Sequence, residues 1–442
     1  MSFKTPLGKT IFETKPISAG CEFVSGYAFK SKDFAEFGFP VIKIKNIQNK
    51  QVTLNGDNQF IPNSVITEKL NKFKLTHGDI LIAMTGQGSV GRVGKLVLND
   101  KQVTPYLNQR VGKFVPHPNV LDKDYLYYCI STSAYESLLF AAGSGSGQPN
   151  LSPSIIKGVE IPFPPIKVQE SISKILRDLD EKIVTNVQMN QTLEEMAQAI
   201  FKSWFVDFEP VKAKMNGELP DGMDAATASL FPEKLVESEL GLIPEGWEIQ
   251  NTGDLFDVKD GTHDSPKKAE EGHYLVTSKH ITGGKIDTSS AYLISDADFE
   301  KVNQRSKVDT FDILLTMIGT VGEVVVVYDN PVEFAIKNVG LFKTSQRPEL
   351  VWLFYWHLQS FKMKNYLEVR MAGTTQQYLT LKTLRTIPVI LPSEDLLKRF
   401  NEMMSPLMEK ISDNHKQNHT LASLRDTLLP KLLSGEIELG KD

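Results

Sequence analysis

Three glycines at residues 86–91 have a spacing that could do chemistry. Gly86, Gly88 and Gly91 spell G-x-G-x-x-G after a predicted strand, a pattern that binds a dinucleotide pyrophosphate when a helix follows. Residues 92–98 instead have the β-branched pattern of another strand. A related string in the second half of the chain keeps only Gly319 and Gly322. We therefore predict a glycine turn between two strands, and no cofactor site.

Other reacting groups are scattered rather than grouped. The eight histidines contain no H-E-x-x-H pattern, and His415 and His419, four residues apart, are predicted to lie on a helix surface. Cys21 and Cys129 have neither metal-ligand spacing nor the number needed for a disulfide framework. The chain has no G-x-x-x-x-G-K-[ST] string for ATP and no Asn/Asp-Pro-Pro-aromatic motif of an adenine methyltransferase. We predict no catalytic residues, no metal and no cofactor in this chain.

An internal duplication organises the elements around these residues. Residues 145–165 match residues 373–393 at an offset of 228, and the same offset continues from residues 179–193 to 407–421. Further upstream the offset is 233 and then about 235, so that residues 77–84 match residues 310–317. A period above 200 residues indicates two copies of a domain and not a solenoid.

Each copy has a β-rich stretch, an apolar helical stretch, a proline-marked strand and a long polar helix. We therefore predict an α+β fold with pseudo-twofold internal duplication, in which two long helices separate two similar β-rich domains. The predicted boundaries are 1–165 for the first domain, 166–205 for its helix, 206–245 for a proline-containing linker, 246–392 for the second domain, 393–434 for the distal helix and 435–442 for a C-terminal tail.

Both long helices carry apolar heptads that are interrupted by asparagines. Asn186 and Asn190 take seam positions in the first helix, and Asn414 and Asn418 take them in the second. A buried asparagine in a coiled-coil seam costs stability but fixes register. Our hypothesis is an antiparallel coiled coil in which the asparagine layers meet and set helix register. The alternative is a solvent-exposed pair on two independent amphipathic helices.

Composition and charge limit the class of protein. A chain of 442 residues with 41% hydrophobic and 23% charged residues is typical of a soluble protein with two or three domains. The N-terminus lacks the apolar segment of a signal peptide, and we find no apolar run of the roughly 20 residues that a membrane helix needs. The net charge is −5, yet residues 1–165 hold 18 Lys+Arg against 12 Asp+Glu. We expect a reduced, cytoplasmic protein whose first domain suits a polyanion partner.

Several local strings, in this order around the repeated helices, resemble specificity subunits of type I restriction–modification systems. They are Ser-Gly-Tyr-Ala-Phe-Lys-Ser at 25–31, Pro-Val-Ile-Lys-Ile-Lys-Asn-Ile at 40–47, Ile-Pro-Glu-Gly-Trp at 243–247, Asp-Gly-Thr-His-Asp at 260–264, the Gly-Asp-Ile-Leu string at 78–81, and the closing segment 428–437. The resemblance covers almost all of residues 1–440.

The resemblance implies that the β-rich domains are target-recognition domains, each reading one half of an interrupted double-stranded DNA sequence. It implies two modification (methyltransferase) subunits as partners, together with restriction (endonuclease and translocase) subunits. S-adenosylmethionine, ATP and Mg are then expected on those partners and not on this chain, which has no membrane role.

Candidate DNA contacts are polar residues on loops that follow predicted strands, because base edges are read by polar side chains and phosphates by Lys and Arg. The first copy offers Lys43, Lys45, Asn46, Gln87, Ser89, Gln109, Arg110, Gln148 and Asn150. The second copy offers Ser278, Lys279, His280, Thr320, Lys337, Asn338, Thr375, Gln376 and Gln377.

Two other functions remain open at this point. The same architecture could be a coiled-coil scaffold that binds proteins without DNA specificity, or a free-standing DNA-binding regulator. Salt-dependent DNA binding that becomes specific only with a methyltransferase subunit would favour the type I function over both.

Overall fold

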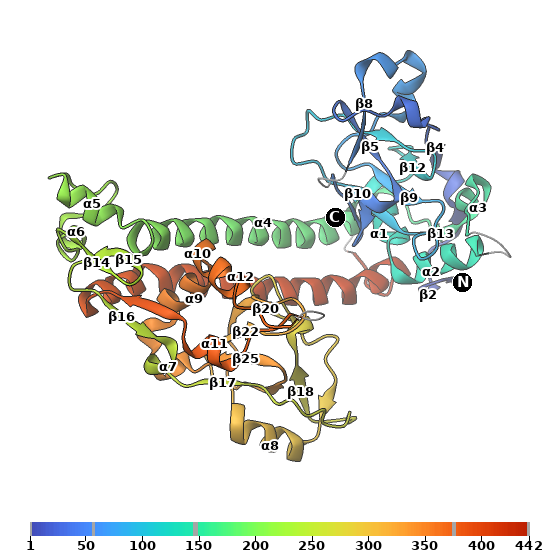
Figure 1. The fold of residues 1–442 in the computed structure, drawn as a ribbon. Coiled ribbons are helices and arrows are strands. Elements are labelled where there is room, and N and C mark those ends of the chain that lie inside the picture. Colours follow the sequence, from blue (N-terminus) through green and yellow to red (C-terminus); the bar gives the residue numbers. More distant parts are fainter. Residues whose placement is uncertain (1, 55–57, 145–148, 374–376, 440–442) are drawn as a thin grey trace. The chain divides into compact units, whose positions relative to one another are not determined.

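A computed structural model describes residues 2–54, 58–144, 149–373 and 377–439 of the protein, which divides into two compact units (Figure 1). Unit 1 comprises residues 1–185 and 417–442, and unit 2 comprises residues 186–416. Each unit therefore combines one β-rich copy with half of each long helix. Among the described residues we find no helix that combines the length and the apolar character of a membrane span.

The β-rich part of unit 1 is built from short elements. Its strands are β1 (Phe3–Thr5), β2 (Gly8–Thr10), β3 (Thr14–Pro16), β4 (Cys21–Ser25), β5 (Phe39–Ile42), β6 (Ile47–Gln48), β7 (Gln51–Val52), β8 (Gln59–Ile61), β9 (Ile80–Ala83), β10 (Val93–Leu96), β11 (Tyr106–Leu107), β12 (Val111–Pro116) and β13 (Glu160–Pro162). Its helices are α1 (Lys123–Ile130), α2 (Ser133–Gly143) and α3 (Pro153–Gly158), with 3₁₀ helices η1 (Ile17–Ala19), η2 (Ser31–Asp33), η3 (Ile44–Asn46), η4 (Asn63–Val65) and η5 (Glu68–Phe73).

The central strand of unit 1 is β9, in a sheet of order β4-β12-β9-β10-β7-β6. All four of its residues are buried, because successive side chains point to opposite faces of the sheet and both faces are covered. Ile80 and Ile82 pack into the core that contains α1 and α2, whereas Leu81 and Ala83 pack into the core around β5 and β11. This double burial explains why the strand is continuously apolar in sequence.

Unit 2 contains the second β-rich copy. Its elements are α5 (Glu209–Met215), α6 (Ala225–Ser229), β14 (Leu235–Ser238), β15 (Gly241–Pro244), β16 (Glu248–Asn251), α7 (Thr252–Leu255), β17 (Val258–Asp260), β18 (His273–Val276), η6 (Ser278–His280), β19 (Ile281–Thr282), β20 (Lys285–Ile286), β21 (Leu293–Ile294), α8 (Asp296–Ser306), β22 (Ile313–Thr316), β23 (Val324–Val326), β24 (Phe334–Ile336), β25 (Val339–Phe342), η7 (Thr344–Gln346), η8 (Pro348–Leu350), α9 (Val351–Gln359), α10 (Phe361–Glu368), α11 (Leu381–Arg385) and β26 (Pro388–Leu391). Residues 206–245, expected as a linker, fold into α5, α6 and the β14–β15 hairpin.

Strand register confirms the duplication. Val111 of β12 pairs with Ala83 of β9, and the corresponding Val339 of β25 pairs with Thr316 of β22. The same agreement holds where β4 pairs with β12 and β17 with β25, and where β10 pairs with β9 and β23 with β22. The predicted glycine turn is also confirmed, because residues 84–92 join the antiparallel strands β9 and β10.

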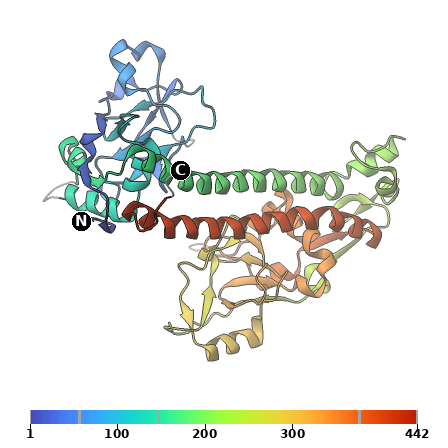
Figure 2. The same cartoon turned by 180° about the vertical axis from the view of Figure 1, so that it is seen from behind.

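The predicted long helices are α4 (Ile166–Phe205) and α12 (Glu394–Ser434), and they pack antiparallel within each unit. In unit 1, Asp180 of α4 pairs with Arg425 of α12 at 2.8 Å, and Leu176 shares a core with Leu429. In unit 2, the ring centroids of Phe205 and Phe400 lie 4.8 Å apart. Seen from behind, the unit 2 part of α12 (residues 394–416) lies along the β-rich part of the same unit (Figure 2), where Trp352 donates to Ser405 Oγ at 3.0 Å.

The asparagine layer lies inside the helix pair of unit 2. Asn414 Nδ2 donates to Asn190 Oδ1 at 2.7 Å, and Asn190 Nδ2 donates to the carbonyl of Ile411 at 3.2 Å. Asn186, Asn190 and Asn414 are all buried, so the alternative of a solvent-exposed asparagine pair is wrong for these three residues. His415, expected on the surface, is half-buried beside Asn190. The role of the layer in setting register stays a prediction.

Replacing the two bonded asparagines tests how much the layer costs in stability. Asn414→Ala should lower the free energy of unfolding by about 1–3 kcal/mol, because it removes the donor to the buried Asn190 Oδ1. The double variant Asn190→Leu/Asn414→Leu should be as stable as the wild type or more so, because both polar groups are removed together. Urea unfolding measures both, and equal losses in the single and double variants would contradict the prediction.

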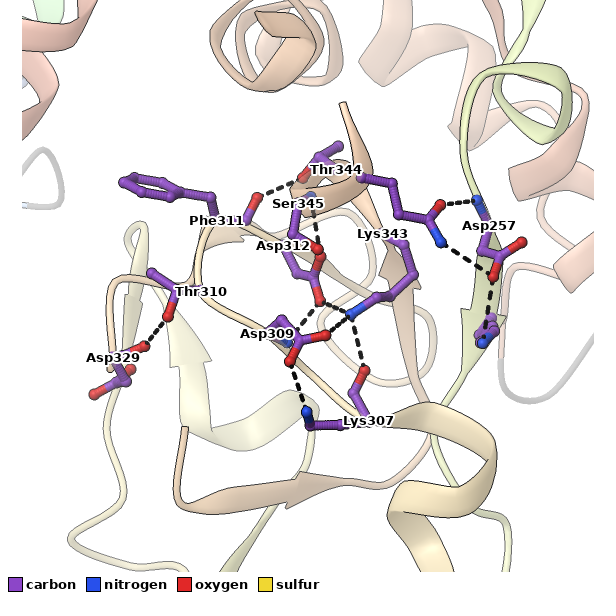
Figure 3. Close-up of polar contacts among 12 residues, drawn as sticks. Asp257, Lys307, Asp309, Thr310, Phe311, Asp312, Asp329, Lys343, Thr344 and Ser345 are labelled. Atoms are coloured by element: carbon purple, nitrogen blue, oxygen red, sulfur yellow. Dashed lines mark hydrogen bonds and ion pairs between the residues drawn. The ribbon is translucent and has the colours of Figure 1, made fainter. Parts of the chain in front are cut away.

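A buried ion pair fixes the turn that leads into the central strand of unit 2 (Figure 3). Lys343 Nζ lies 2.5 Å from Asp312 Oδ2 and 2.6 Å from Asp309 Oδ2, and it donates to the carbonyl of Lys307 at 3.1 Å. Asp312 also accepts from the backbone N–H groups of Asp309 and Ser345. Burial disfavours the charged form of Asp309, but Lys343 and Lys307 outweigh it and hold the pKa of that carboxyl below its usual value.

The first copy also has a buried carboxylate before its central strand, but the lysines that pair with it stand at other positions. Asp79 accepts from the backbone N–H of Thr76, and its carboxylate lies 2.6 Å from Lys113 Nζ and 3.2 Å from Lys123 Nζ. Lys113 Nζ also donates to the carbonyl of Lys74, as Lys343 does to Lys307. In the first copy, the buried carboxylate of Asp79 ties the turn before β9 to Lys113 in the neighbouring strand β12. In the second copy, the buried carboxylate of Asp312 ties the turn before β22 to Lys343, the residue that follows the neighbouring strand β25.

Breaking this pair should be expensive. We expect Asp312→Ala to cost about 3–5 kcal/mol of folding free energy, because it removes the fully buried carboxylate and leaves Lys343 with only the partly exposed Asp309 as counter-ion. The control Lys307→Ala removes an exposed partner of Asp309 and should cost at most about 1 kcal/mol. Thermal and urea unfolding measure both changes, and similar effects in the two variants would refute a special role for the buried pair.

Candidate nucleic-acid interface

Three loops of unit 1 meet where β9 ends and β12 begins. Met84 N–H donates to the Arg110 carbonyl at 2.9 Å, and Leu151 N–H donates to the Met84 carbonyl at 2.7 Å. Thr85 and Asn150 form an isolated bridge, and Asn108 N–H reaches the carbonyl at the end of β5 at 3.2 Å. The loops that hold the predicted contacts are therefore brought to one edge of the sheet, although they lie far apart in sequence.

Most of the predicted side chains at this edge are accessible. Lys45, Gln87, Gln109, Arg110 and Asn150 are exposed, and Ser89 is partly buried. Gly86, Gly88 and Gly91 have positive φ angles, which lets the 84–92 turn close tightly between Gln87 and Ser89. This edge thus presents amide, hydroxyl and guanidinium groups to a ligand, as base-edge recognition requires.

Two of the predicted DNA contacts, Lys43 and Asn46, already make contacts within the protein that would compete with DNA binding. Asn46 is buried, accepts from Lys43 N–H at 2.9 Å and donates to the Thr53 carbonyl and Asn58 Oδ1. Lys43 Nζ bonds Gln59 and lies 4.5 Å from the centre of the Phe34 ring. Burial and the charge of Lys45 lower the pKa of Lys43. Base contact by Asn46 would require its local hydrogen bonds to break.

Unit 2 gathers its candidates at the corresponding edge. Lys337 N–H donates to the Val276 carbonyl, and Asn338 N–H donates to the Thr262 carbonyl. Leu379 N–H donates to the Met317 carbonyl, which places Gln377 beside the loop that holds Thr320. Lys279, Thr320 and Gln377 are exposed, whereas Ser278, Lys337 and Asn338 are partly buried.

His280 is the unit 2 counterpart of Asn46 and has the same local function. It is buried, and its Nδ1 accepts the backbone N–H of Thr277 at 2.9 Å in a 3₁₀ turn like that of Lys43 and Asn46. Burial is the main cause that lowers the pKa of His280. The predicted contacts Gln148, Thr375 and Gln376 lie outside the described residues.

Sequence reasoning missed basic and aromatic groups near these edges. In unit 1, exposed Lys50 and Arg92 line a hollow of about 390 Å³ together with Glu136. In unit 2, the guanidinium of Arg370 stacks 3.6 Å from the centre of the Tyr366 ring, close to the Ala372–Tyr378 bridge. The clustering of Arg92 with the glycine turn was a usable signal, whereas the Arg370–Tyr366 stack needed the fold.

His263 was also missed as a contact, although it belongs to the Asp-Gly-Thr-His-Asp string. Its Nε2 lies 3.0 Å from Asp260 Oδ2, and its Nδ1 lies 2.8 Å from Asn338 Oδ1. Asp260 is buried and also bonds Arg305 of α8. The exposed imidazole of His263 thus links the buried carboxylate of Asp260 to Asn338, one of the predicted base contacts.

The family profile described as "Type I restriction modification DNA specificity domain" matches residues 12–195 and 244–421. The chain belongs to this family. The two matches fall on the two duplicated copies, each with the helix that follows it, so this type I specificity protein contains the family's domain twice.

Named relatives agree with this membership. The chain is 29% identical over 340 residues to the MjaIX type I specificity subunit of Methanocaldococcus jannaschii, covering 75% of this chain and 73% of that one. It is 27% identical over 416 residues to the HindI specificity subunit of Haemophilus influenzae, covering 83% and 88%. A solved type I S subunit from M. genitalium shares the fold, with a TM-score of 0.57, 17% identity and 96% of each chain covered.

Arg110 offers a direct test of this interface. If its guanidinium reads a base, Arg110→Ala should relax the target at one position in one half only, with a loss of discrimination of about 1–3 kcal/mol. Lys9→Ala, an exposed basic residue on β2, is the control and should leave the target unchanged. Binding measured against single-base variants distinguishes the outcomes, and uniform weakening across all sequences would make Arg110 a phosphate contact.

Proposed function

We propose that this chain is the non-catalytic DNA specificity subunit of a type I restriction–modification complex. Unit 1 reads one half of a bipartite double-stranded target, and unit 2 reads the other half. Family membership and the duplicated domain support this proposal. The same membership disfavours a scaffold without DNA specificity and a free-standing regulator.

One observation carries the proposal for bipartite reading. The strands that bring the loops together have the same register in both units, yet the loop tips differ in side chain. Gln109 and Arg110 precede β12, and Lys337 and Asn338 occupy the same place before β25. An identical platform with different polar tips suits two readers of two different sequences.

The helices are proposed to dock modification subunits. Val187, Met189 and Met196 on α4 are 51%, 38% and 48% exposed, so this helix has apolar side chains outside the core for a partner to cover. A duplicated chain offers two related platforms to two copies of one partner. The partners would supply S-adenosylmethionine-dependent methylation, and restriction subunits would add ATP- and Mg-dependent cleavage, in the cytoplasm.

Mapping methylated adenines tests the function. The chain expressed with its cognate modification subunit should produce methylation at one interrupted motif, and the modification subunit alone should produce none. DNA binding by the pair should also weaken steeply as salt rises, because phosphate contacts release counterions. Absence of any sequence-specific methylation by the pair, with both proteins folded and associated, would contradict the proposal.

A further inference from the structure

The contact between His263 and Asn338 lies at the DNA-facing edge proposed for unit 2. Asn338 sits immediately before β25 with a φ of 54°, a left-handed conformation that few non-glycine residues adopt. Its backbone is held by Thr262, and the side chain of the preceding Lys337 bonds Ser265 Oγ. The loop at 262–265 therefore holds both the backbone and the neighbours of Asn338.

The Asn338 side chain is held from one edge. His263 Nδ1 lies 2.8 Å from its Oδ1, while His263 Nε2 lies 3.0 Å from the carboxylate of Asp260. Asp260 has only 8% of its side chain exposed and is fixed in turn by Arg305, whereas the His263 side chain is 62% exposed. An ionised carboxylate only accepts hydrogen bonds, so it orients the imidazole by receiving its Nε2–H. Nδ1 of the neutral ring is then an acceptor, so the Asn338 carboxamide, whose oxygen and nitrogen exchange places by a half turn, bonds it through Nδ2–H.

We propose that His263 is a positioning residue for DNA specificity, which holds the Asn338 carboxamide so that its free edge reads one adenine in the half-site of unit 2. The proposal rests on the proposed function. A carboxamide has two acceptor sites and two N–H donors, so one contact with His263 leaves a donor and an acceptor for the N6 and N7 groups of adenine. A side chain that is already oriented loses less freedom on binding than a mobile one.

Unit 1 lacks this arrangement, which makes it specific to one half of the target. At the positions that correspond to Asp260, His263 and Asn338 it has Ser25, Ala28 and Arg110. A guanidinium presents a rigid fork of donors and does not need an acceptor neighbour to select its orientation. The two units thus reach base edges by different means at the same place in the fold.

The test measures discrimination at single base pairs. The complex with the modification subunit is assayed on DNA in which each position of the mapped motif is varied, by binding competition and by methylation rate. Asn338→Ala should abolish the preference for one adenine in one half-site, a loss of roughly 5- to 150-fold. His263→Ala should reduce the preference at that same position at least several-fold and leave the other positions unchanged.

Two further variants separate positioning from folding. His263→Asn keeps an amide near the place of Nδ1 and should restore part of the preference. His273→Ala removes a histidine that stacks on Phe299 at the opposite end of β18, so it should affect stability without changing base preference. Weakening at every position of the half-site in His263→Ala would show a merely structural role and overturn the inference.

The proposed function and this inference fail in different ways. If the wild-type complex methylates no interrupted motif, the proposed function is wrong. If it does, and His263→Ala keeps full discrimination at the position that Asn338→Ala disrupts, only the positioning role is wrong. An Asn338→Ala variant with unchanged specificity would also refute the inference while leaving bipartite recognition intact.

Discussion

A buried carboxylate–ammonium pair at the entry of the central strand is the interaction on which each reading edge depends. Asp79 with Lys113, and Asp312 with Lys343, join the turn before that strand to its neighbouring strand or the residue after it. The loops that we propose to read bases lie at the other end of the same two strands, after Ala83 and before Val111 in unit 1. The two strands are joined by hydrogen bonds along their length. An ion pair that holds them together at one end therefore also limits where the loops at the other end can lie.

Duplication explains why the platform is constant while its tips vary. A change of register by one residue would turn every side chain of β9 or β22 to the opposite face, into a buried core that is packed around side chains of other shapes, so register is strongly constrained. Loop tips such as Arg110 and Asn338 do not fill the core and can change at little cost in stability. The two copies therefore share the strand register and differ in the side chains of the loops.

The sequence predicts the repeat, the two long helices and the strands, because these follow from a hydrophobic periodicity that occurs in both copies of the duplicated unit. It also predicts that the loops with Gln87, Gln109 and Asn150 are polar and that Asn190 and Asn414 interrupt the seam. It does not predict that Asn46 and His280 are buried, since a polar residue after a strand can also close a 3₁₀ turn from inside; their role as DNA contacts stays a prediction. The sequence does not identify His263 as a site residue, because its proposed role depends on a long-range contact with Asn338 that periodicity does not encode.

The two halves of the helix pair differ where the repeat would make them equal. In unit 1, Asp180 binds Arg425 and accepts from Tyr128, whereas the corresponding residues of unit 2 are the apolar Met408, Ala197 and Trp356. If α4 paired with the α4 of another chain in the same register, Asp180 would face Ala197. An α12 pair would likewise set Arg425 against Met408. Each mispairing leaves a partly buried charge without its partner, so this asymmetry favours α4 with α12 over like-with-like association.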